Sequence, residues 1–184
     1  MQLLKSSALA ADFDHPLEML KACHERMRTQ CDTLRRLAAH LSAHRCDDPA
    51  RQAVTNVIRF FGSAGRHHHE DEESDLFPAM IAAATGLNTE RIALLVQKLE
   101  VEHRELEQAC KSLCSDLEKI ARGEAATLDE LEVNRFNTVY RAHSALEDAA
   151  LIPLAAMVLS GPELAAVGRS MARRRGVTPE PGRR

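Results

Sequence analysis

Residues 68–78 read HHEDEESDLFP, and this stretch returns in the second half of the chain as HSALEDAALIP at residues 143–153. The two copies share a histidine, a glutamate four residues later, a second acidic residue after it, and then a leucine, an apolar residue and a proline. Residues at i and i+4 project from the same face of a helix, so each histidine and glutamate can reach one site from one helix. The repeat predicts two similar helical halves that each present a histidine and a carboxylate.

A lone histidine stands upstream of each copy, His24 before the first and His103 before the second. Both take positions where the apolar pattern of a bundle helix asks for leucine or isoleucine. Apolar residues recur in steps of three and four along four segments, and breaks at 46–49, 85–88 and 122–127 separate these segments. Pro78 is expected to bend or end the second segment. Four long helices with short links predict an all-α, antiparallel up-down four-helix bundle.

The chain length of 184 residues suits one domain with a short tail. We expect an N-terminal lead at 1–15, the bundle at 16–159, a short C-terminal fifth helix at 160–175 and a disordered tail at 176–184. The basic run from Arg173 to Arg175 is expected to be solvated.

Composition narrows the class of protein further. Aromatic residues make up 3% of the chain, tryptophan is absent and the formal net charge is -3. This composition favours helices over strands, and so small a charge gives no field that would attract nucleic acid. Residues 1–11 lack the apolar run of a secretory signal, and no later stretch is long enough to span a membrane. Five cysteines without paired zinc-binding spacings suit a reducing compartment, so a cytoplasmic protein without nucleic-acid or membrane partners is expected.

The height of each histidine along the bundle can be compared, because two residues on antiparallel neighbours lie level when they are equidistant from the turn. The midpoint of His24 and His68 is residue 46, and the midpoint of His103 and His143 is residue 123. Both midpoints fall in predicted turns. All four helices are therefore expected to bring their polar residues to one layer.

The expected layer holds four imidazoles and two carboxylates within an apolar core. An unpaired buried carboxylate is costly or shifts its pKa until it neutralises, so two of them need a common partner. Six ligands exceed the four that zinc prefers, and the mixture of hard and borderline donors suits iron or manganese. We expect two bridged ions with open positions for a small molecule. The predicted metal ligands are His24, His68, Glu72, His103, His143 and Glu147.

This arrangement resembles the hemerythrin-like HHE cation-binding family. The shared pattern is a lone histidine on the first helix, His-x-x-x-Glu and Leu-Phe-Pro on the second, a lone histidine on the third and His-x-x-x-Glu on the fourth, over residues 16–159. The resemblance implies a bundle with two iron ions and an oxo or hydroxo bridge. Manganese and zinc are the alternative metals for this set of ligands. It also implies that the site binds or reacts with dioxygen, nitric oxide or peroxide.

The chain departs from the oxygen-carrying hemerythrins in two places. Those proteins have His-x-x-x-His on the third helix, where this chain has His103 and Glu107. They also have an aspartate five residues after the fourth-helix histidine, where this chain has both Glu147 and Asp148. The internal repeat favours Glu147 as the bridge. A lost imidazole, with or without a gained carboxylate, favours the ferric state, which speaks against reversible oxygen carriage.

Three residues beside the six have two interpretations each. Glu107 either joins the site or pairs with Lys111 on the helix surface, and the surface pair is favoured. His69 either offers a competing register for the ligand helix or supports a ligand from outside. Tyr140 either donates a hydrogen bond near the site or only packs.

Three functions fit such a site. The first is a protein that binds or senses dioxygen, nitric oxide or peroxide; the sequence shows no output domain, so signalling would need a partner protein. The second is an oxidase or peroxidase that consumes these molecules, which ranks lower because the sequence has no signature for an organic substrate. The third is iron or zinc handling without redox turnover, and a ferritin-type oxidase is disfavoured because paired Glu-x-x-His motifs are absent.

Overall fold

The computed structural model describes residues 12–44 and 46–177, and all regular structure in these residues is helical. This confirms the predicted all-α class. The elements are α1 (Pro16–Ala43), α2 (Asp48–Phe60), η1 (Phe61–Gly65), α3 (Arg66–Asp71), η2 (Glu72–Leu76), α4 (Phe77–Ala83), α5 (Leu87–Ala121), α6 (Glu130–Leu146), η3 (Glu147–Leu151), α7 (Ile152–Val158) and α8 (Gly161–Arg174).

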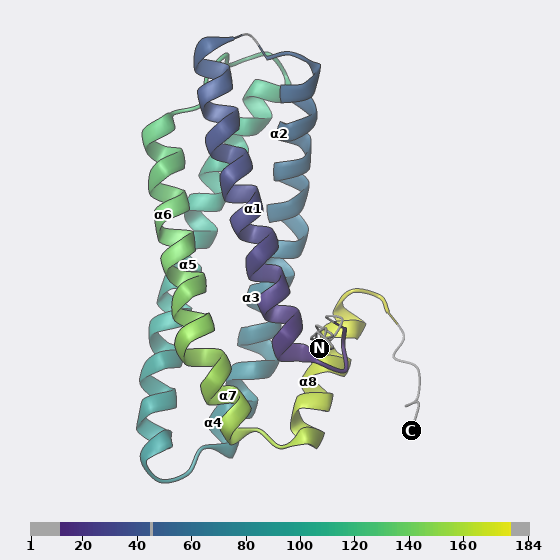
Figure 1. Cartoon of the computed structure of the whole chain (residues 1–184), viewed down its shortest axis with the longest axis vertical. Helices are drawn as coiled ribbons and strands as arrows, with labels where there is room; N and C mark the ends of the chain where they lie inside the picture. The colour runs from purple at the N-terminus through teal and green to yellow at the C-terminus, as the bar shows by residue number, and fades with distance from the viewer. Residues whose placement is uncertain (1–11, 45, 178–184) are drawn as a thin grey trace, which may run out of the picture.

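Within the described residues the elements join into long rods (Figure 1). The run from α2 to α4 is one continuous helix, and so is the run from α6 to α7. Helix α1 packs against α2 and α6, and α5 packs against the same two helices from the other side. The four rods therefore enclose a common interior.

Two apolar clusters fill this interior. One surrounds Leu34, Val54 and Leu117, and the other surrounds Leu76 and Ile92. Along every rod the predicted polar residues stand where one cluster gives way to the other. The polar layer is thus closed off by apolar side chains above and below.

Short π-helical turns begin at the two glutamates of the repeat, one at Glu72 and one at Glu147. A proline follows each turn. Proline has no backbone N–H to donate, and its ring clashes with the carbonyl four residues earlier in a regular α-helix. The backbone N–H of Phe77 instead bonds to the carbonyl of Glu72, five residues back. The π turn contains one more residue than an α-helical turn, and the helix continues through the proline. The second helix continues to Ala83, so an end at Pro78, one of two expected outcomes, is wrong.

The predicted core stripe needs one correction on α6. Apolar spacing in the sequence predicts an interior stripe through Phe136, Val139 and His143, but Val139 is 40% exposed, whereas Tyr140 is 3% exposed and packs in the core. The interior face of α6 passes through Phe136, Tyr140 and His143, in steps of four and three. The larger Tyr140 side chain therefore takes the interior position, although the neighbouring Val139 is the more apolar of the two.

Helix α8 packs against α1, α3 and η2, at a place that the sequence did not predict. Arg174 donates hydrogen bonds to Asp71 and, at 2.6 Å, to Asp75, and Arg175 donates to Asp71 at 2.6 Å. Asp71 is 1% exposed, so its carboxylate depends on these partners. The expectation that Arg173 to Arg175 form a solvated end is therefore wrong for two of the three. Most of the predicted disordered tail, 178–184, lies outside the described residues, as does 1–11 of the lead.

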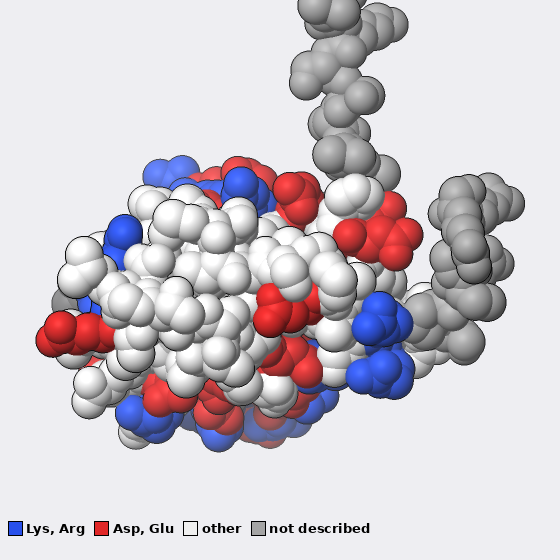
Figure 2. All heavy atoms as spheres, turned by 90° about the horizontal axis from the view of Figure 1, so that it is seen from below, with Lys and Arg blue, Asp and Glu red and all other residues white. Residues whose placement is uncertain are grey.

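The end of the molecule that carries the α4–α5 and α7–α8 links is largely free of charged side chains (Figure 2). Exposed apolar residues on these elements include Ile81, Leu87 and Met157. Even so, none of the helices in 12–44 and 46–177 combines the length and the apolarity needed to cross a membrane.

We predict that Arg174→Ala lowers the free energy of unfolding by about 1–3 kcal/mol, because the buried Asp71 loses one of its two guanidinium partners. Arg173→Ala is the matched control, since Arg173 is exposed and bonds to Ser170 of its own helix. Its effect should stay below about 0.5 kcal/mol. Urea denaturation measures both variants, and equal losses would contradict the role given to Asp71.

Candidate metal centre

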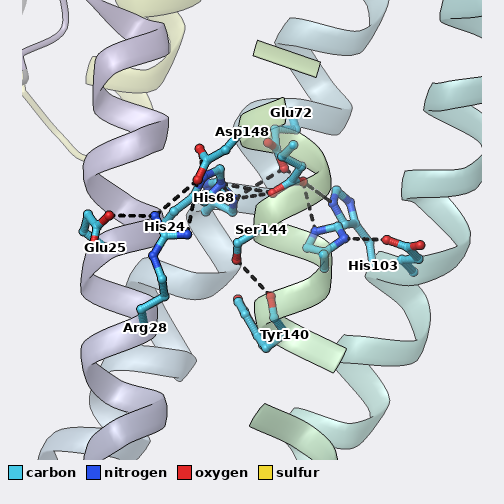
Figure 3. Close-up of polar contacts among 12 residues, drawn as sticks. His24, Glu25, Arg28, His68, Glu72, His103, Tyr140, Ser144 and Asp148 are labelled. Carbon is cyan, nitrogen blue, oxygen red and sulfur yellow. Dashed lines mark hydrogen bonds and ion pairs between the residues drawn. The ribbon is translucent and has the colours of Figure 1, made fainter. Parts of the chain in front are cut away.

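The six predicted ligands lie in one buried layer, and each is at most 2% exposed. Figure 3 labels four of them, His24, His68, Glu72 and His103. They come from all four rods: His24 from α1, His68 and Glu72 from α3 and η2, His103 from α5, and His143 and Glu147 from α6 and η3. The sequence therefore brings four imidazoles and two carboxylates to one level, as the midpoints of the turns predict.

Glu147 stands between two pairs of imidazoles. Its Oε1 atom is 2.9 Å from Nε2 of His143 and 3.4 Å from Nε2 of His103. Its Oε2 atom is 3.0 Å from Nε2 of His24 and 3.7 Å from Nε2 of His68. Each oxygen of one carboxylate thus faces a different pair, which is the arrangement that a carboxylate bridging two cations requires.

Glu72 links the same two sides of the layer. Its Oε2 atom is 3.6 Å from Nε2 of His68 and 3.4 Å from Nε2 of His103. Glu72 and Glu147 begin the two π turns, so the local backbone that tolerates each proline also places each carboxylate. The two glutamates occupy equivalent places in the two halves of the chain.

Three of the imidazoles are held from behind by a carboxylate at Nδ1. These contacts are His24 to Asp148 at 2.8 Å, His103 to Glu73 at 2.7 Å and His143 to Glu102 at 2.8 Å. In the neutral ring, a proton on Nδ1 that is donated to a carboxylate leaves Nε2 as a free electron-pair donor. All three rings therefore turn their basic nitrogen toward the layer.

The supporting carboxylates were not assigned these roles from the sequence. Asp148 and Glu73 each follow a glutamate of the repeat, and Glu102 precedes His103, so their proximity to ligand positions was the available signal. Asp148 also accepts hydrogen bonds at 3.2 Å from Arg28, which holds it beside His24. Asp148 therefore lies behind the His24 ring, and of the two adjacent acidic residues it is Glu147 whose carboxylate lies in the layer.

Charge in the layer depends strongly on protonation when no cation is bound. Burial lowers the pKa of His103, but the carboxylates of Glu147 and Glu72, each 3.4 Å from its Nε2 atom, outweigh burial and raise this pKa to about 10. Burial also raises the pKa of Glu147, yet the imidazoles beside its carboxylate, led by His103 and His143, bring this pKa well below its usual range. Glu147 is thus ionised, and protons on the imidazoles balance its charge.

Several buried atoms of the layer have no hydrogen bond of proper geometry among the described residues. They are both oxygens of Glu72, Oε2 of Glu147, Nε2 of His143 and Nδ1 of His68. The carboxylate oxygens among them, and the Nε2 atom when it carries no proton, are electron-pair donors that a bound cation would pair with. His24, His68, Glu72 and Glu147 offer ligand atoms within 4.8 Å of one another, so this cluster could hold a metal ion.

His69 lies closer to the layer than the sequence indicated. It groups with His103 and His143, with ligand atoms within 4.8 Å of one another, and its Nε2 atom is buried without a partner among the described residues. Its ring stacks on that of His103, with centroids 4.0 Å apart and planes 11° apart. A metal in the plane of one stacked ring lies well outside the plane of the other. In this orientation His69 therefore flanks His103 and does not share an ion with it.

The remaining candidates lie outside the layer or beside it. Glu107 pairs with Lys111 at 2.8 Å on the surface and is 61% exposed, so it is directed away from the site. Tyr140 is buried between Phe61 and Phe136, with ring centroids 5.7 and 5.4 Å away, and packs one turn below His143. The helix that carries His103 therefore supplies one imidazole and no second ligand to the layer.

Comparison with known proteins places the chain in a family. Residues 15–155 match the model of the hemerythrin HHE cation-binding domain. The chain belongs to this family, which confirms the resemblance drawn from its motifs. It is also 30% identical over 177 residues to an uncharacterized protein of Haemophilus influenzae (strain ATCC 51907 / DSM 11121 / KW20 / Rd), a match that covers 96% of this chain and 99% of the relative.

We predict that the metal-free protein loses stability as the pH rises from about 6.5 to about 10. The pKa of His103 is about 10 in the folded chain and 6.5 in the unfolded chain, so its protonation stabilises the folded state. This contribution is complete below pH 6.5 and is lost as the pH rises through about 10. The loss should be on the order of a few kcal/mol. Urea denaturation of chelated protein measures it. His103→Gln should flatten the profile, and an unchanged profile in this variant would contradict the assignment.

Proposed function

We propose that this chain is a hemerythrin-like non-haem di-iron protein that binds or senses dioxygen, nitric oxide or peroxide. The observation that carries the proposal is the position of Glu147, whose two oxygens face two separate pairs of imidazoles. A single ion would leave one pair and one oxygen unused. Two ions bridged by Glu147 and Glu72 use the whole layer.

The fold we propose is an antiparallel up-down four-helix bundle, with α8 as the added fifth helix. Its support is the short connection between successive rods, such as 84–86 between α4 and α5, and the packing of each rod on its neighbours in a ring. A bundle with this connectivity brings one ligand-bearing stretch from every rod to the same height.

The donor set favours iron. Four imidazoles and two carboxylates mix borderline and hard donors, which suits iron or manganese better than the four-coordinate sites that zinc prefers. The proposed ligands are His24, His68, Glu72, His103, His143 and Glu147, which gives four donor groups per ion if both carboxylates are shared. When bound, the iron pair supplies open coordination positions and redox chemistry for a small molecule.

The residues of the chain contribute orientation and exclusion of water. Asp148, Glu73 and Glu102 fix three imidazoles with Nε2 directed inward. The apolar clusters on either side, with buried Leu106 in one and Leu99 in the other, close the layer to bulk solvent. A molecule that reaches the site must therefore be small and able to pass an apolar wall.

Mixing anaerobic ferrous protein with stoichiometric dioxygen tests the function. A persistent coloured adduct, or a stable nitrosyl complex with nitric oxide, supports binding or sensing. Repeated consumption of dioxygen or peroxide would instead identify the alternative, a di-iron oxidase or peroxidase. Absence of any reaction would leave iron or zinc handling without redox turnover.

We predict that protein produced with ample iron contains about two metal ions per chain, because two bridged ions satisfy the unpaired donors of the layer. Elemental analysis of the purified protein measures the content. One zinc ion and no iron under these conditions would contradict the di-iron proposal.

We predict that Glu147→Ala loses bound metal, whereas Asp148→Ala still binds about two ions at saturating iron. Glu147 faces the centre of the layer, but Asp148 reaches the layer only through the outer nitrogen of His24, so its loss should change affinity roughly 10- to 100-fold. Metal titration followed by elemental analysis compares the two variants. The reverse order would assign the bridge to Asp148.

A further inference from the structure

The contacts behind the imidazoles follow the internal repeat of the chain. Asp148, the residue after Glu147, supports His24, and Glu73, the residue after Glu72, supports His103. These two contacts are equivalent, because each half of the chain lends a carboxylate to the lone histidine of the other half. One kind of support is therefore present twice.

The second kind of support is present once. Glu102, the residue before His103, binds Nδ1 of His143 at 2.8 Å. The equivalent of His143 in the other half is His68, and the residue before His24 is Cys23. Cys23 is 5% exposed, and it precedes His24 as Glu102 precedes His103. A thiol thus stands where the repeat would place a carboxylate.

With a thiol in place of a carboxylate, one imidazole of the layer lacks a hydrogen-bond acceptor. Nδ1 of His68 is buried and has no partner of proper geometry among the described residues. A thiol is a weak acceptor, whereas a carboxylate accepts strongly and makes the imidazole a better donor to a metal. His68 is therefore the least supported of the four imidazoles.

We propose that Cys23 makes the two ion positions unequal, so that the ion between His24 and His68 is held more weakly and exchanges, while the ion between His103 and His143 is retained. This inference rests on the proposed pair of ions. Loss of one such supporting contact typically lowers metal affinity 10- to 100-fold. The protein would then load its ions in a fixed order.

Anaerobic titration of the metal-free full-length chain with ferrous iron, in competition with a chromogenic chelator, tests the proposal. The wild type should bind two ions in two steps that differ roughly 10- to 100-fold in affinity. Cys23→Asp, which is close to cysteine in size, should tighten the weaker step and bring the two affinities together. Glu102→Gln should weaken the tighter step instead.

Two further substitutions of Cys23 separate hydrogen bonding from charge and from loss of folding. Cys23→Asn accepts a hydrogen bond without adding charge, so a partial tightening of the weaker step distinguishes hydrogen bonding from simple attraction between charges. Cys23→Ser makes the smallest change of the three. It replaces Cys23→Asp in the titration if a thermal melt shows that the buried aspartate prevents folding.

Two outcomes would overturn the inference. Equal affinities for the two ions in the wild type would do so, as would a Cys23 substitution that shifts both steps alike or neither. Either result leaves the di-iron proposal intact, because two ions are still bound. Saturation at a single ion is distinguishable from both, since it overturns the di-iron proposal together with this inference.

Discussion

Two fully buried carboxylates, Glu72 and Glu147, set the conditions that the rest of the structure meets. A carboxylate in an apolar interior loses its hydration, and two of them at one level also repel each other. Protonated imidazoles balance part of this charge in the metal-free chain, as the high pKa of His103 indicates. Cations balance it better because they are attracted to both carboxylates at once. The helix lengths, the turns and the apolar clusters all serve to keep this layer at one height.

Much of this arrangement could be predicted from the sequence. Helical periodicity identifies the face that carries His24 or His103, and equal spacing from the turns identifies their height. Both inferences use local information, which is why the six side chains meet as expected. Their role as metal ligands remains a prediction, because proximity and unpaired donors show what the layer could hold and do not identify an ion.

Other features lie beyond such reasoning. The π turns at Glu72 and Glu147 insert an extra residue that a period of 3.6 does not reveal, although the prolines after them marked the place. Arg174 meets Asp71 across 103 residues of sequence, and no local pattern encodes that contact. Val139 and Tyr140 are neighbours, and periodicity alone does not distinguish which of the two faces the interior. The bulkier Tyr140 is buried, although Val139 is the more apolar residue.

The two halves of the chain are alike at the centre of the layer and differ around it. His69 has Ser144 as its counterpart in the repeat, and the serine hydroxyl bonds to the carbonyl of Tyr140 in its own helix. The stacked ring of His69 therefore lies on the His103 side, the side that Glu102 also supports. Both differences add polar groups beside His103 and His143, whereas the side of His24 and His68 has the thiol of Cys23. A repeated sequence can supply two matching sets of ligands, but a site that directs a small molecule to one ion needs this kind of inequality around them.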